Sequence, residues 1–455
     1  MKKSILVLVA LLIAFAPAYA QEANKEAKKA EVKSHLKQHF KPYGFIRNYF
    51  TYDSRESISG TGDLYNYQPK DQNLNAYGDD LNATSTFRFL SLTTRVGLNI
   101  VDYKWRNTEF CGKIEADFYA GLSTKTNQTH SVSGTAQFRL RQAYVTLGWD
   151  SLKMGKDFAR VDLTIGQTWH PMAADLCDVI ALASGAPFGP FNRSPQVKMD
   201  ARLGKYVTLT AAGLWQMQYL STGPEGQSAE YMLYSKTPEA YLGLSFHDKG
   251  FLMRVGADVL SIQPRHLGTV KDNAGNDVQV KVNDRITTAS PFIYLQYKKG
   301  EFSIKAKSIF AEAGEHMNLN SGYGISKINP DGSYEYTPLR NSSSWISIVY
   351  GGKVGAQEDK HPQKLQGILF AGYIHNFGTK DTLVGSLYTP RPNTMREMWR
   401  LTPTLLYTVG KFQVGLEYEI TSVQYGKGLD THGLAQNDLH WVTNHRVQLM
   451  TKYNF

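Results

Sequence analysis

The chain has 455 residues, a formal net charge of +10, 27 tyrosines and 39 glycines, and 12% of its residues are aromatic. After residue 21 no apolar run is long enough for a transmembrane helix, which excludes a helical membrane protein. Helical apolar periodicity is nearly absent too, although a soluble multidomain protein of this length should show it. The composition instead suits β-strands with one apolar face and one wet face.

The first twenty residues have the three parts of a secretory signal peptide. Lys2 and Lys3 form a short positive segment, residues 5–17 are apolar, and residues 18–20 make a small-x-small cleavage site. A retained anchor helix is the alternative, disfavoured because the apolar run is short and no stop-transfer pattern follows. We therefore expect an exported chain that is cut between Ala20 and Gln21. For an exported chain the basic charge points to anionic lipid or anionic solutes, and a nucleic-acid partner is excluded.

Residues 22–39 are charged and rich in alanine. Two interpretations stay open: a solvated and partly disordered tail, or a short periplasmic helix that helps a trimer to associate. No sustained heptad repeat favours the second interpretation.

From residue 43 onward the apolar side chains recur with a period of two. The final segment is the clearest, since Val447, Leu449 and Phe455 share one face whereas Arg446 and Lys452 share the other. Such alternation is typical of a strand in a transmembrane β-barrel, weak in one segment and strong when repeated. A β-sandwich would also alternate, but its strands would be shorter. We expect the final strand to close the barrel by pairing with the strand that begins near Tyr43.

About sixteen segments show this pattern, an even number as single-chain bacterial barrels require. They are 43–53, 86–101, 107–121, 136–149, 159–168, 195–202, 205–219, 237–247, 251–263, 285–298, 301–314, 342–352, 364–376, 395–409, 411–423 and 441–455.

The connections between these segments alternate in length. Short turns alternate with long polar loops at 54–85, 122–135, 169–194, 220–236, 264–284, 315–341, 377–394 and 424–440. Insertion into an outer membrane from one side produces this alternation. The predicted fold class is therefore all-β, a transmembrane antiparallel β-barrel of about sixteen strands. The predicted domains are a signal peptide at 1–20, a helical or disordered periplasmic segment at 21–40, and the barrel at 41–455.

The third long loop, residues 169–194, differs from the others. It carries an apolar centre at 179–183 and a Gly/Pro section at 187–190, whereas the other loops are hydrophilic. A long apolar connection needs a surface to pack on. We expect it to fold into the barrel and narrow the opening, since a barrel of this size otherwise encloses a wide aqueous channel. An external lid or a trimer-contact loop is the alternative.

Positive side chains outnumber negative ones on the inward face. The basic positions are Arg47, Arg95, Lys113, Arg139, Arg141, Lys198, Arg202, Arg254, Lys305, Lys307, Arg396, Arg400 and Arg446. The acidic positions are Glu115, Asp117, Asp162, Asp200, Asp258, Glu417 and Glu419. The excess predicts a pore lining that favours anionic solutes. The alternative is that pairs on neighbouring strands neutralise one another and leave a generic wet lumen.

Arg139 and Arg141 place two guanidinium groups on one face, a spacing suited to holding carboxylate or phosphate. We expect Asp175 and Asp178 of the third loop to face this pair across the gap and form a transverse field. Cys111 and Cys177 can pair or remain separate thiols, and the sequence does not decide between these.

No motif of a serine hydrolase, zinc protease or phosphate-binding loop occurs, and His170 and His445 stand alone. A lone histidine is more often structural than catalytic. The sequence therefore predicts neither an enzyme nor a cofactor or metal.

Three short motifs resemble those of one family. They are Tyr43-Gly44-Phe45-Ile46-Arg47, Phe138-Arg139-Leu140-Arg141-Gln142-Ala143-Tyr144-Val145 and Leu163-Thr164-Ile165-Gly166-Gln167-Thr168-Trp169. They look like the N-terminal half of DcaP-type porins, within the wider group of Gram-negative trimeric porins. The likeness covers the chain up to about residue 200, and the remainder is similar only as a generic barrel.

The resemblance implies a homotrimer, a sixteen-stranded barrel, an inward third loop and a basic pore for small anions or dicarboxylates. Carried onto this chain, it assigns the pore to Arg47, Arg139, Arg141 and residues 169–194. The segment at 22–39 departs from the family, because it is short for the coiled coil that some members carry.

The sequence thus predicts an outer-membrane porin for passive diffusion of small hydrophilic, anionic solutes, with outer-membrane lipid and two further copies as partners. The selectivity residues are Arg47, Arg95, Lys113, Arg139, Arg141, Arg254, Arg396, Arg400, Arg446, Asp175 and Asp178. The alternatives are a barrel with a surface-binding, adhesin-like role and a barrel that serves as the scaffold of a hydrolase.

Overall fold

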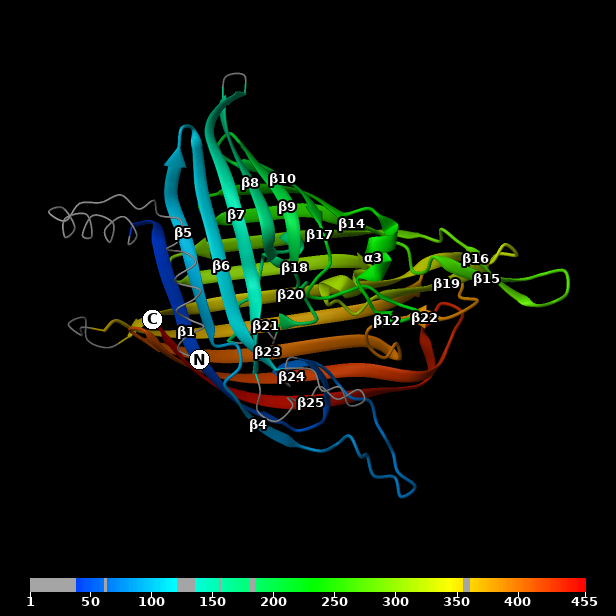
Figure 1. The fold of residues 1–455 in the computed structure, drawn as a ribbon. Helices are drawn as coiled ribbons and strands as arrows, with labels where there is room; N and C mark the ends of the chain where they lie inside the picture. Colours follow the sequence, from blue (N-terminus) through cyan, green and yellow to red (C-terminus); the bar gives the residue numbers. More distant parts are fainter. Residues whose placement is uncertain (1–37, 61–63, 121–135, 155–156, 181–184, 355–360) are drawn as a thin grey trace, which may run out of the picture.

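One closed antiparallel sheet dominates the computed structural model of the chain (Figure 1). The structure describes residues 38–60, 64–120, 136–154, 157–180, 185–354 and 361–455. The predicted signal peptide and most of the segment at 21–40 lie outside these ranges.

Sixteen strands form the barrel wall in the described ranges, which confirms the predicted fold class and strand count. They are β1 (Phe40–Asp53), β5 (Arg95–Trp105), β6 (Thr108–Ala120), β7 (Ala136–Met154), β8 (Asp157–Trp169), β9 (Arg193–Leu203), β10 (Val207–Leu214), β13 (Glu239–Asp248), β14 (Phe251–Ile262), β17 (Ile286–Lys299), β18 (Phe302–Glu312), β20 (Tyr334–Val354), β21 (Gln363–Thr379), β23 (Met395–Val409), β24 (Phe412–Leu429) and β25 (Ala435–Asn454).

Shorter elements lie between these strands. The strands β4 (Thr86–Leu90), β19 (Gly322–Ile328) and β22 (Leu387–Tyr388) extend the main sheet. Three small hairpins are β2 (Ser57–Gly60) with β3 (Tyr65–Pro69), β11 (Thr222–Gly223) with β12 (Gly226–Gln227), and β15 (Leu267–Lys271) with β16 (Asp277–Lys281). The helical turns are η2 (Pro171–Ala173), α3 (Glu230–Ser235) and η4 (Gly314–Met317).

None of the helices that the structure describes has the length and the apolar character needed to cross a membrane.

The barrel closes where its first strand meets its last. β1 pairs antiparallel with β25 from Phe45 opposite Asn454 to Asp53 opposite Arg446. On β25, Val447 and Leu449 are exposed on the outer face. The residues that alternate with them, Arg446, Gln448 and Met450, point inward and are buried. The predicted closure and the predicted facing of the last strand are both confirmed.

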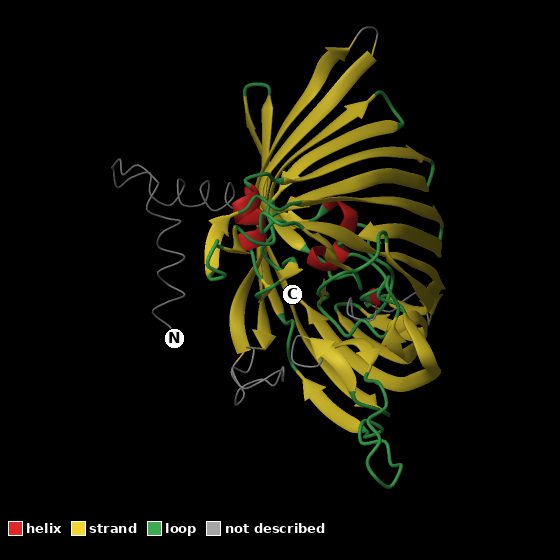
Figure 2. Ribbon diagram, turned by 90° about the vertical axis from the view of Figure 1, so that its right-hand side faces the viewer, coloured by secondary structure: helices red, strands yellow, loops and turns green. Residues whose placement is uncertain are grey.

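The third loop folds into the barrel, as predicted. Residues 170–192 join β8 to β9, and in Figure 2 loop and helical segments lie within the curve of the strands. The amide of Ile180 donates to Glu417 on β24 (3.1 Å), and Ser343 on β20 donates its hydroxyl to the carbonyl of Phe188 (2.7 Å). The Phe188 ring packs edge-on against Phe370 of β21. Of the predicted apolar centre, residues 181–183 fall outside the described ranges.

The first long loop, residues 54–85, also enters the barrel. Its sequence had predicted only a hydrophilic loop. All five residues of β3 are buried. Asn66 donates its side-chain amide to Glu419 on β24 (3.0 Å), and Tyr425 donates its hydroxyl to the carbonyl of Pro69 (2.6 Å). Tyr65 and Tyr67 supply the apolar surface of this contact. The short run Leu64-Tyr65-Asn66-Tyr67 was the available signal in the sequence.

One predicted strand is too long. β10 ends at Leu214 rather than at 219, and the Trp215 amide makes one further hydrogen bond to β9, at the carbonyl of Pro195. The chain then turns inward, so that the hydroxyl of Tyr219 lies 3.3 Å from that of Tyr67 on β3. The structure thereby places Tyr219, the last residue of the predicted strand, inside the barrel.

Gly372 on β21 permits the third loop to dock. A Cβ atom at this position would lie 2.5 Å from ring atoms of Phe188, whereas one at Gly367 on the same strand would have no neighbour nearer than 3.9 Å. We predict that Gly372→Val displaces the loop and lowers the free energy of unfolding by about 1–3 kcal/mol. Single-channel conductance should rise in this variant. Gly367→Val is the matched control, and an equal conductance change in the control would contradict the prediction.

Candidate pore lining

A cluster of basic side chains covers one side of the inner wall. It consists of Arg47, Arg95, Lys113, Arg139, Arg141, Arg193 and Lys452, from β1, β5, β6, β7, β9 and β25. We call this cluster the basic wall. Arg193 is coupled electrostatically to Arg139 and Arg141, and Lys452 to Arg47 and Arg95, so that the members share one electrostatic environment.

Two buried carboxylates on β6 hold the centre of the basic wall. Arg141 contacts both, at 2.9 Å from Glu115 and 2.6 Å from Asp117. Arg139 binds Asp117 at 3.0 Å, and Arg95 lies 3.4 Å from Glu115. A buried carboxylate needs such partners because burial without them is costly. Lys113 is also 3.6 Å from Glu115, so that four cations share two anions.

The other three cations of the basic wall contact neutral groups. Arg47 donates to the Thr93 hydroxyl (2.7 Å), and Lys452 lies over the Phe45 ring at 4.6 Å. Arg193 lies over the Trp169 ring at 4.7 Å. The basic wall and its ion pairs thus comprise seven cations and two carboxylates, an excess of five positive charges within this cluster.

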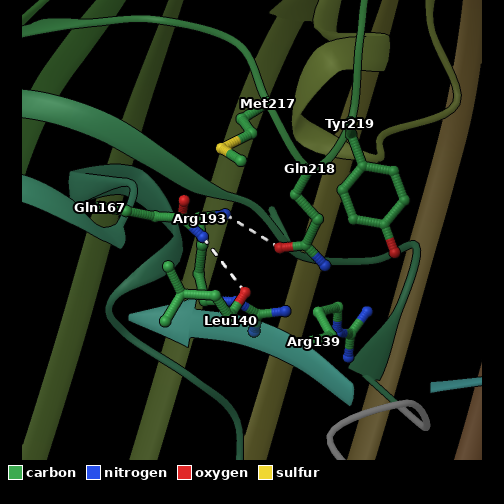
Figure 3. Close-up of a pocket in the computed structure, with 7 residues that line it drawn as sticks. All are labelled: Arg139, Leu140, Gln167, Arg193, Met217, Gln218 and Tyr219. Atoms are coloured by element: carbon green, nitrogen blue, oxygen red, sulfur yellow. Dashed lines mark hydrogen bonds between the residues drawn. The ribbon is translucent and has the colours of Figure 1, made fainter. Parts of the chain in front are cut away.

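A cavity of about 270 Å³ opens beside the basic wall (Figure 3). Its lining residues are Arg139, Leu140, Gln167, Arg193, Met217, Gln218 and Tyr219, none of them acidic. Arg193 is 1% exposed, and its Nη1 has no hydrogen-bond partner among the described residues. Its backbone amide donates to Gln218 (3.1 Å), which fixes the segment after β10 against the start of β9. The cavity therefore presents cationic and amide donors to whatever enters it.

Arg193 was not among the predicted lining residues. It stands at the junction of the third loop and the strand expected to start at 195, where alternation assigns no face. Lys452 was placed on the inward face by its strand, and the structure agrees.

Among the predicted lining arginines, Arg141 is only 3% exposed within its ion pairs, and two others are buried beneath the inserted loops. Arg400 is 1% exposed and donates to the carbonyls of Ala186 in the third loop and Asn66 in the first. Arg446 is 4% exposed, binds Asp53 through two nitrogens and donates to the carbonyl of Leu64. Alternation places these side chains inward correctly, but the two inserted loops cover them.

Asp175 and Asp178 are bound to the wall on which the third loop lies. Asp175 forms an ion pair with Arg254 of β14, and Asp178 with Lys305 of β18 at 2.8 Å. The two aspartates were expected to face Arg139 and Arg141 as free carboxylates and to form a transverse field. This prediction was wrong, because cations of β14 and β18 neutralise both carboxylates. The remaining predicted residue, Arg396, donates to the carbonyl of Ala435 at the start of β25 (3.0 Å).

A second cavity, of about 620 Å³, lies between the third loop and the turn that joins β13 to β14. Its charged lining residues are three basic, Lys198, Arg202 and Arg254, and three acidic, Asp162, Asp200 and Asp248. Lys198 pairs with Asp200 at 2.6 Å. This cavity is therefore balanced in charge, unlike the one beside the basic wall.

The two cysteines are free thiols. Burial raises the pKa of Cys177 to about 12, with the neighbouring Asp178 adding to the effect, so this thiol stays protonated at neutral pH. The structure thus favours the separate-thiol alternative.

From the sequence His170 was expected to stand alone, but in the structure it has two acidic neighbours. Its imidazole converges with Glu239 of β13 and Asp258 of β14, and the possible ligand atoms of the three lie within 4.8 Å of one another. The two strands are adjacent in the sheet but separated in sequence from the loop that carries the histidine. Spacing along the chain therefore could not indicate this group.

Comparison with solved structures identifies proteins of similar fold, whereas comparisons of the sequence find no match. No family model matches the chain, and no curated protein matches it in sequence. Among solved structures, the outer membrane channel DcaP of Acinetobacter baumannii is similar, with 17% identity, a TM-score of 0.60, and coverage of 91% of this chain and 97% of that one.

Two looser likenesses are an anion-selective porin from Comamonas acidovorans (10% identity, TM-score 0.48, covering 91% and 99%) and OmpT of Vibrio cholerae (10% identity, TM-score 0.47, covering 91% and 97%). The chain has the fold of an outer-membrane channel.

Arg400 should matter for stability, because its removal leaves two loop carbonyls without this buried donor and Glu419 without its neighbouring cation. We predict that Arg400→Met lowers the free energy of unfolding by about 3–5 kcal/mol. Denaturant titration of the folded barrel measures this. Arg202→Met, at an exposed inner-wall arginine, should change the free energy by less than about 0.5 kcal/mol. Equal losses in the two variants would show that Arg400 does not hold the loops.

Proposed function

We propose that the protein is a passive diffusion channel of the outer membrane for small hydrophilic, anionic solutes. The observation that carries the proposal is the excess of five positive charges on the basic wall, next to a cavity without an acidic lining residue. The opposite side carries its charges as ion pairs, such as Asp178 with Lys305. A wet passage with one cationic side attracts anions and repels cations.

The outer surface supports insertion in a membrane. Exposed apolar and aromatic side chains recur along the outer face of neighbouring strands, among them Trp399, Leu401, Leu405, Trp441, Val447 and Leu449. In hydrocarbon a closed sheet leaves no unpaired backbone edge, so this arrangement suits a lipid bilayer. Export through the predicted signal peptide would bring the chain to the outer membrane.

The shape of the cavity indicates the size class of solute. A volume of about 270 Å³ beside Arg139 and Arg193 accommodates an ion or a small organic anion. Guanidinium groups recognise carboxylate and phosphate through two parallel hydrogen bonds. Gln167 and Gln218 add amide groups to the same lining.

The charge proposal is tested by the reversal potential in planar bilayers under a salt gradient. We predict anion preference for the unaltered protein, and a lower anion-to-cation permeability ratio in Arg139→Gln and Arg193→Gln. One charge about 8 Å from the ion path contributes about 0.5 kcal/mol in water, with opposite sign for an anion and a cation, which corresponds to roughly a fivefold change in the ratio. Lys271→Gln, in the exposed β15–β16 hairpin, is the control and should leave the ratio unchanged. Cation preference in the unaltered protein would reject the proposal.

We further propose that three copies of the chain assemble into the functional unit, an assembly implied by the resemblance to trimeric porins. Insertion of one particle into a bilayer should then produce three equal conductance steps on closure at high voltage. Chemical cross-linking in detergent should give a trimer band. Single-step closure together with a monomer band would contradict the trimer and leave the charge proposal intact.

A further inference from the structure

Two histidines and two carboxylates meet inside the barrel, away from the basic wall. His170 belongs to the third loop and His316 to η4 between β18 and β20, whereas Glu239 and Asp258 lie on β13 and β14. All four side chains are at most 2% exposed. Within the described ranges, no lysine or arginine forms an ion pair with either carboxylate. The polar partners of the two buried carboxylates are therefore the two histidines, whose Nε2 atoms lie 2.5–3.5 Å from the carboxylate oxygens.

The histidine His316 is oriented as a ligand. Its Nδ1 lies 3.2 Å from the carbonyl of Ala313, which can only accept, so Nδ1 carries the proton. Its Nε2 faces the carboxylates, 3.3 Å from Glu239 Oε1 and 3.5 Å from Asp258 Oδ2. A carbonyl on the far nitrogen is the usual support of a metal-binding histidine.

These separations are those expected around a metal ion. Nitrogen and oxygen atoms bound at about 2.0–2.15 Å in a tetrahedral arrangement lie roughly 3.3–3.5 Å apart. They are longer than the 2.7–3.2 Å typical of a hydrogen bond. Glu239 Oε2, Asp258 Oδ1 and His316 Nε2 have no hydrogen-bond partner among the described residues. Buried polar atoms without partners are uncommon in native proteins and invite an explanation.

His170 has a different role from His316. Its Nδ1 accepts the amide of Met172 (3.1 Å), so the proton lies on Nε2. Nε2 donates this proton to Glu239 Oε1 at 2.5 Å. His170 thereby orients the carboxylate, whose Oε1 also faces His316 Nε2 and whose Oε2 has no hydrogen-bond partner among the described residues.

We propose that His316, Glu239 and Asp258 bind a divalent first-row transition metal ion such as Zn²⁺, with His170 as the positioning residue for Glu239. Imidazole and carboxylate ligands suit this class of ion. One divalent ion balances the two carboxylates while both histidines stay neutral. The bound ion ties the third loop, through His170, and the segment of His316 to the wall strands β13 and β14. The inference is independent of the solute that the channel conducts.

The test uses the full-length barrel purified in detergent without a polyhistidine tag. The protein is treated with a chelator, dialysed against Zn²⁺ and then against metal-free buffer, and its zinc is measured by mass spectrometry. We expect about one ion per chain in the unaltered protein and less than about a tenth in His316→Ala and Asp258→Asn. His440→Ala is the matched control, since His440 also contacts an aspartate, Asp71 at 2.7 Å, but near the surface.

The positioning role of His170 has its own readout. His170→Gln keeps a donor toward Glu239 and should weaken Zn²⁺ binding by about 10–100-fold without abolishing it. Visible absorption of the Co²⁺-loaded unaltered protein reports coordination directly, which keeps the test valid if a variant fails to fold. Less than about a tenth of an ion per chain in the unaltered protein would overturn the proposal. So would equal loss of zinc in His316→Ala and His440→Ala.

Discussion

Backbone pairing between the first and last strands is the constraint on which the rest of this structure depends. In hydrocarbon an unpaired strand edge is too costly, so the sheet has to close, and β1 meets β25 over nine consecutive residue pairs. Closure fixes which face of every strand points outward. It also creates an interior wider than the side chains of the wall can occupy, since a sixteen-stranded barrel encloses an aqueous space. The loops that fold into that space determine which side chains line it.

The first and third long loops enter it, and buried arginines secure them. A loop backbone inside a barrel carries carbonyl groups that strands do not satisfy, and each needs a donor. Arg400 donates to both loops and Arg446 to the first, while Asp53 and Glu419 offset their charges. Aromatic contacts, such as Phe188 against Phe370, complete the attachment. The inward-facing arginines therefore include some that hold loops, such as Arg400, and others that pair with carboxylates on the wall strands, such as Arg141.

The interior is consequently divided by charge. Where the third loop lies on the wall, its aspartates pair with Arg254 and Lys305. On the other side, four cations share Glu115 and Asp117, and three more have neutral partners. The buried histidine–carboxylate group at β13 and β14 is a third environment, with two negative charges and no lysine or arginine in ion-pair contact among the described residues. Neighbouring parts of the barrel interior thus differ in the charge that their side chains carry.

The amino-acid sequence by itself determined the class of fold. Period-two alternation fixed the facing of strands such as β25, and alternating connection lengths fixed their order, because both signals are local. The apolar content of residues 169–194 was likewise enough to indicate a loop that packs inside. These features require no knowledge of which distant segments meet.

Tertiary structure alone decided which inward charges remain accessible. The alternation of residues along their strands placed Arg400 and Arg446 on the inward face. The burial of both side chains depends on loops hundreds of residues away in the sequence. Arg193 lies where alternation stops, so its place beside Arg139 follows from the docking of two loop ends. His170 and His316 meet Glu239 and Asp258 only because four separate segments converge. A contact between segments far apart in sequence leaves no periodic signal, and for that reason the lining of this barrel could not be read from its strands.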